Sequence, residues 1–165
     1  GQPLTVVDGA RNPSSAQALA AALRARQRTC SPRKLIFLLG CSADKDLPSI
    51  VAPLATLADG AIVVQAHHHR AADPAALAAL WRGHGVPVEI VPPVEKALLR
   101  AREWAGPDGW VCAGGSFFVV AEVREALGMA VREPWPEPAG ESPNRSDSLA
   151  ATSTPCPHPP PGPGR

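Results

Sequence analysis

Short apolar runs alternate with longer amphipathic segments over most of the chain. The apolar runs occupy residues 4–7, 35–39, 61–64, 88–91 and 110–113. Each run is too short to form a helix of ordinary length, and each is bounded by polar, proline or glycine positions. The pattern therefore predicts five strands.

Between and after these runs, apolar residues recur at helical spacing. These segments lie at residues 16–23, 50–57, 77–81, 94–104 and 116–127. In the last of them we expect Phe117, Val120, Ala121 and Val123 to form the apolar face. Three helix starts also have a capping side chain, at Asn12, Asp73 and Ser116.

Apolar strands that alternate with amphipathic helices are typical of a mainly parallel sheet that is covered on both faces, because parallel neighbours need a helical crossover. The expected fold is therefore α/β, three-layer and Rossmann-like, with five to six strands. In such sheets, ligands bind outside the carboxyl ends of the strands. The loops that follow each strand are where a functional site is expected.

The pattern ends at about Arg132. Residues 133–165 are rich in proline, glycine and serine, and little apolar material is left to bury. We expect an α/β domain at residues 1–132 and a disordered proline-rich tail at 133–165. Because Met129 is the only methionine, we also expect the chain to be a piece of a longer protein.

Charge and composition exclude several classes of partner. Sixteen basic and fifteen acidic residues give a net charge of +1, so no overall field attracts nucleic acid or a membrane surface. The four cysteines lack metal-type spacing, and no apolar stretch approaches the ~20 residues of a membrane span. We expect reduced thiols in a cytoplasmic monomer that binds neither nucleic acid nor membrane.

The first loop after a strand carries a candidate ligand site. Asp8 ends the strand, Gly9 permits a tight turn, and Asn12 caps the next helix. Helix N-termini attract phosphates and carboxylates, and a carboxylate beside one can accept hydrogen bonds from sugar hydroxyls. The alternative is that Asp8 only caps the turn, and a single acidic residue after a strand is common.

Two later loops carry cations. Lys45 could neutralise a substrate carboxylate. The alternative for this segment is a solvated turn in which Asp44 or Asp46 caps the next helix, and for Asp46 this is the favoured interpretation. Arg70 is a candidate contact for phosphate or glutamate. It follows three histidines at residues 67–69, which favour a polar loop over a metal site because neighbouring side chains on an extended segment diverge. Before the last helix, Ser116 serves as a cap after two glycines, in a turn that resembles an anion-holding turn.

Four motifs in order give these loops a more specific meaning. They are D-G-A-R-N-P at residues 8–13, G-C-S-A-D-K-D at 40–46, R-A-A at 70–72 and G-S-F-F-V-V-A-E-V at 115–123. Together they resemble the C-terminal domain of the folylpolyglutamate synthases and dihydrofolate synthases of the Mur ligase superfamily. The resemblance covers residues 4–127, and its strength lies in the order and spacing of the four motifs.

The resemblance implies an ATP-dependent ligase that activates a folate or dihydropteroate carboxylate as an acyl phosphate and joins it to L-glutamate. By analogy, Asp8 contacts the ATP ribose, Arg11 binds nucleotide and glutamate, and Lys45 binds glutamate. Arg11 departs from the family, which usually has His at this position. An Arg can hold a carboxylate, but it cannot act as an acid or base near neutral pH.

The chain lacks a phosphate-loop motif G-x-x-x-x-G-K-[ST]. The resemblance implies that this loop and the Mg²⁺ ligands lie in a preceding ATPase domain. We therefore expect ATP and Mg²⁺ as cofactors of the whole ligase. In this domain we expect no metal site and no catalytic residue, and we expect the chain alone to be inactive. Two alternatives stay open: a Mur ligase of cell-wall synthesis, and a stand-alone α/β module that binds a nucleotide or a small acid.

Overall fold

The structure is a computed structural model, and it describes residues 1–30 and 34–129. The expected tail at residues 133–165, and its boundary with the domain, lie outside the described residues. All statements about structure below concern the described part of the chain.

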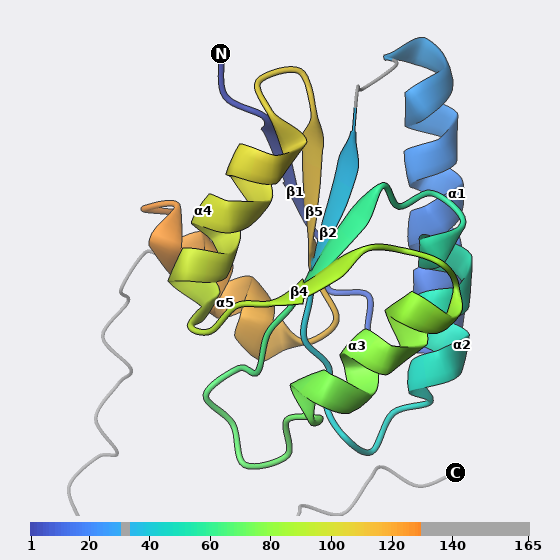
Figure 1. The fold of residues 1–165 in the computed structure, drawn as a ribbon, viewed down its shortest axis with the longest axis vertical. Helices are drawn as coiled ribbons and strands as arrows, with labels where there is room; N and C mark the ends of the chain where they lie inside the picture. Colours follow the sequence, from blue (N-terminus) through green and yellow to red (C-terminus); the bar gives the residue numbers. More distant parts are fainter. Residues whose placement is uncertain (31–33, 130–165) are drawn as a thin grey trace, which may run out of the picture. The chain divides into compact units, whose positions relative to one another are not determined.

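A parallel sheet forms the centre of the fold (Figure 1). Among the described residues it has five strands in the order β1-β5-β2-β3-β4, and every pairing is parallel. Their bounds are β1 Leu4–Val7, β2 Leu35–Leu39, β3 Gly60–Val63, β4 Val88–Ile90 and β5 Trp110–Gly114. The five strands and the α/β fold class predicted from the sequence are therefore confirmed.

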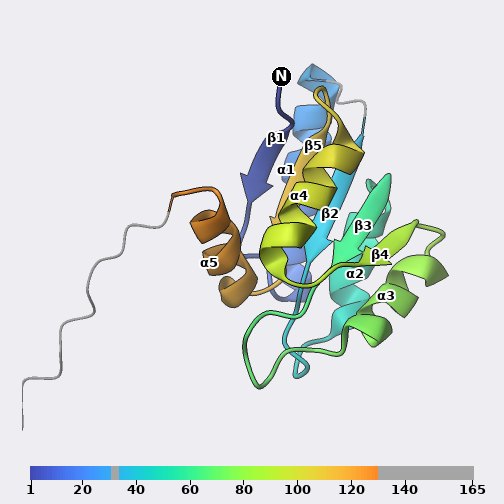
Figure 2. The same ribbon diagram turned by 60° about the vertical axis from the view of Figure 1, so that its left-hand side comes forward.

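Helices cover both faces of the sheet (Figure 2). The helices α1 (Pro13–Thr29), α2 (Leu47–Ala55) and α3 (Pro74–Gly83) lie on one face, and α4 (Val94–Ala105) and α5 (Phe117–Ala126) lie on the other. On β2, Leu35, Phe37 and Leu39 pack toward the first layer, whereas Ile36 and Leu38 pack toward the second. Both faces of the strand are buried, as a continuous apolar run predicts.

The predicted helix caps form. The side chain of Asn12 accepts the backbone N–H of Ser15 at 2.8 Å, and that of Asp73 accepts the N–H of Ala75 at 2.9 Å. Ser116 caps α5 by accepting the N–H of Val119 at 3.2 Å. Asp46 also caps α2, which agrees with its interpretation as a capping residue.

The predicted apolar face of α5 is confirmed for Val123 but wrong for Phe117 and Ala121. Val119 and Val123 are buried, whereas Ala121 is exposed and the Phe117 side chain keeps 60% of its surface accessible. The reason is that Val119 and Val123 are four residues apart and face the sheet together, while Phe117 begins the helix beyond the sheet's carboxyl edge. Two exposed aromatic residues, Phe117 and Phe118, are therefore left at that edge.

The order of the strands creates a crevice at this edge. The chain passes from β1 to β4 through helices on one face, then returns through α4 on the other face to place β5 between β1 and β2. The loop after β5 consequently leads to the opposite face from the loops after β1 and β2. Neighbouring loops that diverge in this way leave space between them, which is where ligands bind in open α/β sheets.

Candidate functional site

A cleft of about 230 Å³ lies at this crevice. Its walls come from the loops after β1, β2, β3 and β5 and from the first turn of α5. The lining residues are Arg11, Ser42, Asp44, Lys45, His68, Arg70, Gly115, Ser116, Phe117 and Phe118.

Three cations from three different loops line this cleft among the described residues: Arg11, Lys45 and Arg70. Asp44 is the acidic residue of the lining and forms an ion pair with Lys45, at 3.0 Å between Oδ2 and Nζ. The hydrogen bond from Lys45 lowers the pKa of the Asp44 carboxyl, and the charges of Lys45 and Arg70 add to this effect. The balance of charge favours an anionic ligand.

The loops after β2 and β3 are joined through their backbones. The N–H of Ala43 donates to the carbonyl of Arg70 at 2.8 Å, and the N–H of Ala72 donates to the carbonyl of Cys41 at 2.8 Å. Ser42 and Ala71 form an antiparallel bridge between these two bonds. The two loops that carry Lys45 and Arg70 are therefore fixed relative to each other.

The turn after β1 places Arg11 against an aromatic ring. The guanidinium of Arg11 lies over the ring of Phe117, with 4.0 Å from Cζ to the ring centroid. Gly9 permits this arrangement, because a Cβ at its position would lie 2.9 Å from the Phe117 ring. Arg11 is thus supported by α5, on the far side of the crevice from its own loop.

The remaining predicted residues of this turn have structural contacts. Asp8 accepts the N–H of Ala10 at 2.7 Å, which is the turn-capping role considered as its alternative. Asp8, Gly9 and Asn12 are not among the lining residues of the cleft. The ribose contact of Asp8 therefore stays a prediction.

The turn between β5 and α5 depends on Gly115. Its φ is +94°, and a Cβ there would lie 2.7 Å from the carbonyl oxygen of Gly40. A side chain would therefore be strained and would collide with the backbone that follows β2. This close approach brings Ser116 to the cleft, where its hydroxyl caps α5.

The three histidines make different contacts, as a bent polar loop allows. The backbone and ring of His67 contact Glu122, whereas the ring of His68 stacks on Phe118 with centroids 3.9 Å apart. Burial lowers the pKa of His68, and the charges of His69 and Arg70 lower it further. In residues 1–30 and 34–129 no group of three or more His, Cys, Asp or Glu side chains could hold a metal ion.

A second cleft, of about 650 Å³, lies between α4, α5 and His67. Its described lining includes Glu95, Glu122 and Glu125 and lacks Lys or Arg. This charge would repel a phosphate or carboxylate. The smaller, cationic cleft is therefore the candidate site.

The cysteines in the described part are free thiols. Cys41 and Cys112 are buried, as expected for cysteines within or beside apolar runs, and burial raises the pKa of each thiol to about 12. Both are therefore protonated near neutral pH and act as small apolar side chains. Among the described helices, none is long and apolar enough to cross a membrane.

The cations and the cap of this cleft were predicted from the sequence, but several of its wall residues were not. Ser42, His68, Phe117 and Phe118 were not predicted as site residues. One signal was available: two large aromatic residues directly after a capping serine lie at the carboxyl edge and not over the sheet.

The chain is similar to known proteins in both sequence and fold. The family described as Mur ligase, glutamate ligase domain, matches residues 1–117. The chain is 34% identical over 131 residues to a probable bifunctional folylpolyglutamate synthase/dihydropteroate synthase of Haloferax volcanii, and the match covers 79% of this chain and 15% of that protein.

Solved structures show the same fold. A bifunctional folylpolyglutamate synthase/dihydrofolate synthase with Mn, AMPPNP and L-glutamate bound is 29% identical with a TM-score of 0.66, over 76% of this chain and 29% of that one. A Mycobacterium tuberculosis folylpolyglutamate synthase complexed with ADP and AMPPCP is 28% identical with a TM-score of 0.67, over 75% and 29%. The chain thus spans less than a third of the length of each of these relatives.

Proposed function

The chain belongs to the Mur ligase family as a glutamate ligase domain, and from this premise we propose that it is the part of an ATP-dependent ligase that binds L-glutamate and one edge of the nucleotide. The parent enzyme joins L-glutamate to folate or dihydropteroate through an acyl phosphate. The observation that carries the proposal is the convergence of Arg11, Lys45 and Arg70, from three separate loops, on one cleft at the carboxyl edge of the sheet.

The cleft suits an amino acid with two carboxylates. Arg11 and Arg70 each present a planar fork that can bind a carboxylate through two hydrogen bonds, and Lys45 supplies a compact charge. A related bifunctional folylpolyglutamate synthase/dihydrofolate synthase has been solved with L-glutamate and AMPPNP bound, which supports glutamate and nucleotide as the ligands. Asp8 follows β1 and is assigned to the ATP ribose.

The catalytic machinery is assigned to another part of the parent protein. Because the sequence lacks a phosphate loop, we place the γ-phosphate site and the Mg²⁺ ligands in an ATPase domain that closes over this one and excludes water from the acyl phosphate. The chain by itself is then inactive. We place the ligase in the cytoplasm, where its buried thiols stay reduced.

Reconstitution tests the proposal. Mixing or fusing the chain with a matching ATPase domain should give ligation that depends on both ATP and L-glutamate. Asp8→Ala and Lys45→Ala should each impair it, whereas Arg82→Ala, on α3, should not. Ligation unaffected by Asp8→Ala and Lys45→Ala would contradict the site assignment.

Two alternatives are separated by the same assay. A Mur ligase of cell-wall synthesis would accept a nucleotide-linked muramyl acid and not pteroate, so product analysis with both substrates decides between them. A stand-alone module would bind a nucleotide or a small acid yet give no product with any ATPase domain. An upstream reading frame that encodes a phosphate loop would favour the ligase.

A further inference from the structure

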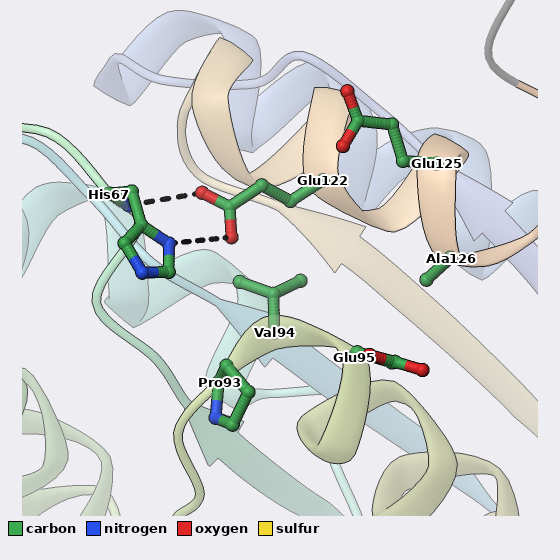
Figure 3. A pocket seen from close by; sticks show the side chains of 7 residues that line it. All are labelled: His67, Pro93, Val94, Glu95, Glu122, Glu125 and Ala126. Carbon is green, nitrogen blue, oxygen red and sulfur yellow. Dashed lines mark hydrogen bonds and ion pairs between the residues drawn. The ribbon is translucent and has the colours of Figure 1, made fainter.

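The loop between β3 and α3, residues 64–73, carries Arg70 to the cationic cleft and is held from outside by α5. Glu122 of α5 makes the first contact (Figure 3). Its Oε1 accepts the backbone N–H of His67 at 3.0 Å, and its Oε2 lies 3.5 Å from Nδ1 of the His67 ring. Fifty-five positions in the sequence separate these two residues.

The second contact from α5 is one residue further along the loop. The rings of His68 and Phe118 stack at 3.9 Å with an interplanar angle of 23°. Nδ1 of His68 in turn accepts the backbone N–H of Arg70 at 3.2 Å. The His68 ring therefore connects α5 to the backbone of the cation that lines the cleft.

This connection requires a particular protonation state. Nδ1 can accept the N–H of Arg70 only when it carries no proton, so the proton of neutral His68 is on Nε2. Burial, together with the neighbouring positive charges of His69 and Arg70, lowers the pKa of His68, a direction that favours this neutral form. The geometry and the charge of the ring agree.

The His67 side chain cannot hold the loop by burial, because 84% of its surface is accessible, whereas the Glu122 side chain is only 25% accessible. The carboxylate of Glu122 is thus the more fixed partner. It fixes the backbone of His67 directly before the residue that stacks on Phe118.

We propose that Glu122 is a positioning residue of the cleft: it holds His67, so that His68 stacks on Phe118 and keeps Arg70 at the cleft. Its link to catalysis rests on the function proposed above, because Arg70 is assigned there to glutamate. The claim that Glu122 fixes the position of the loop between β3 and α3 does not depend on that function. It concerns only where the loop lies.

Three variants of the full chain test this claim about the loop by NMR. Glu122→Ala should accelerate hydrogen exchange of the His67 amide by roughly tenfold. It should also shift the amide signal of Arg70 and move the ¹⁵N signal of His68 Nδ1 away from that of an acceptor nitrogen. Glu122→Gln should restore much of the protection, because its amide oxygen can accept the same N–H.

Glu125→Ala is the matched control, since Glu125 lies on α5 and lines the same acidic cleft as Glu122. It should leave the His67 and Arg70 signals unchanged. If Glu122→Ala also leaves them unchanged while Glu122→Gln folds normally, the proposal is overturned.

The reconstituted ligase then separates this proposal from the proposed function. Glu122→Ala should raise the KM for L-glutamate severalfold with a smaller change in kcat. An unchanged KM in an active ligase would refute the catalytic link and leave the ligase assignment intact. If neither the unsubstituted protein nor any variant ligates glutamate, the ligase assignment fails. The changes in hydrogen exchange and in the His68 tautomer would still support Glu122 as the residue that positions the loop.

Discussion

The guanidinium of Arg11 lies 4.0 Å above the ring of Phe117, and these two residues come from opposite sides of the crevice at the carboxyl edge. Arg11 follows β1, whereas Phe117 begins α5 after β5. An arginine side chain that already packs on an aromatic ring loses less conformational entropy when it binds a carboxylate. The exposed aromatic residue therefore lines the candidate site together with Arg11.

Replacing this ring should weaken glutamate binding. Phe117→Leu removes the cation–π contact but keeps an apolar side chain, so the KM for L-glutamate of the reconstituted ligase should rise about two- to fivefold, as expected for the loss of an exposed contact of this kind. Leu99→Ala, an exposed apolar residue of α4, is the control and should have no effect. Equal KM values for the two variants would show that Phe117 does not support Arg11.

Arg11→His would introduce the residue that the family usually has. A histidine is charged below its pKa of about 6.5 and neutral above it, whereas arginine stays charged throughout. In Arg11→His, the KM for L-glutamate should therefore rise as the pH increases from about 6 to 8. The unsubstituted protein should lack this rise, and a flat profile for both would argue against Arg11 as a carboxylate ligand.

The close approach of β2 and β3 to α5 should make Gly40 intolerant of a side chain. A Cβ there would lie 2.7 Å from the carbonyl oxygen of Val64 and 2.8 Å from Cγ2 of Val119. Gly40→Ala should lower the free energy of unfolding by about 1–3 kcal/mol, measured by denaturant titration. Gly83→Ala in α3 has nothing within 4 Å of the added Cβ and should instead raise it by about 0.5–1 kcal/mol.

The pair of Glu89 and Arg100 should contribute a pH-dependent part of the stability. Two hydrogen bonds of 2.8 Å join the carboxylate on β4 to the guanidinium on α4. The bonds from Arg100, and then its charge, lower the pKa of Glu89 below its ordinary value of 4.5. A lowered folded-state pKa gives stabilisation that is complete above about pH 4.5 and is lost as the pH falls through the folded value.

Because both side chains are 38% accessible, solvent screens this pair. Glu89→Gln should thus lower the free energy of unfolding at pH 7 by about 0.5 kcal/mol, and the difference should shrink as the pH falls through the lowered pKa of Glu89. Glu103→Gln removes a more exposed contact to Arg100 and should have a smaller effect. A difference for Glu89→Gln that persists in acid would show that packing, not charge, stabilises this contact.

The fold was predictable because the signals for its strands and helix starts lie within short segments of the sequence. Continuous apolar runs such as Leu35–Leu39 can be buried only between two layers, and Asn12, Asp73 and Ser116 mark helix starts within a few residues of their partners. That Arg11, Lys45 and Arg70 line one cleft was predictable for a related reason. Each follows a strand, and the carboxyl ends of parallel strands share one edge.

The long-range contacts around these cations were not predictable. The contact of Glu122 with His67 spans 55 residues and depends on α5 turning to the opposite face from α1. Helical periodicity also misplaced Phe117, because it cannot show that the first turn of a helix extends past the sheet. Only the strand order reveals which loops diverge.

The most direct test of the cationic cleft as the glutamate site is an NMR titration of the full chain with L-glutamate, using L-glutamine as the matched ligand. Glutamate should shift the side-chain signals of Arg11, Lys45 and Arg70 in one saturable step. Glutamine, which lacks the second carboxylate, should shift them less and bind more weakly. Equal responses to both ligands, or shifts that avoid these three residues, would contradict the account.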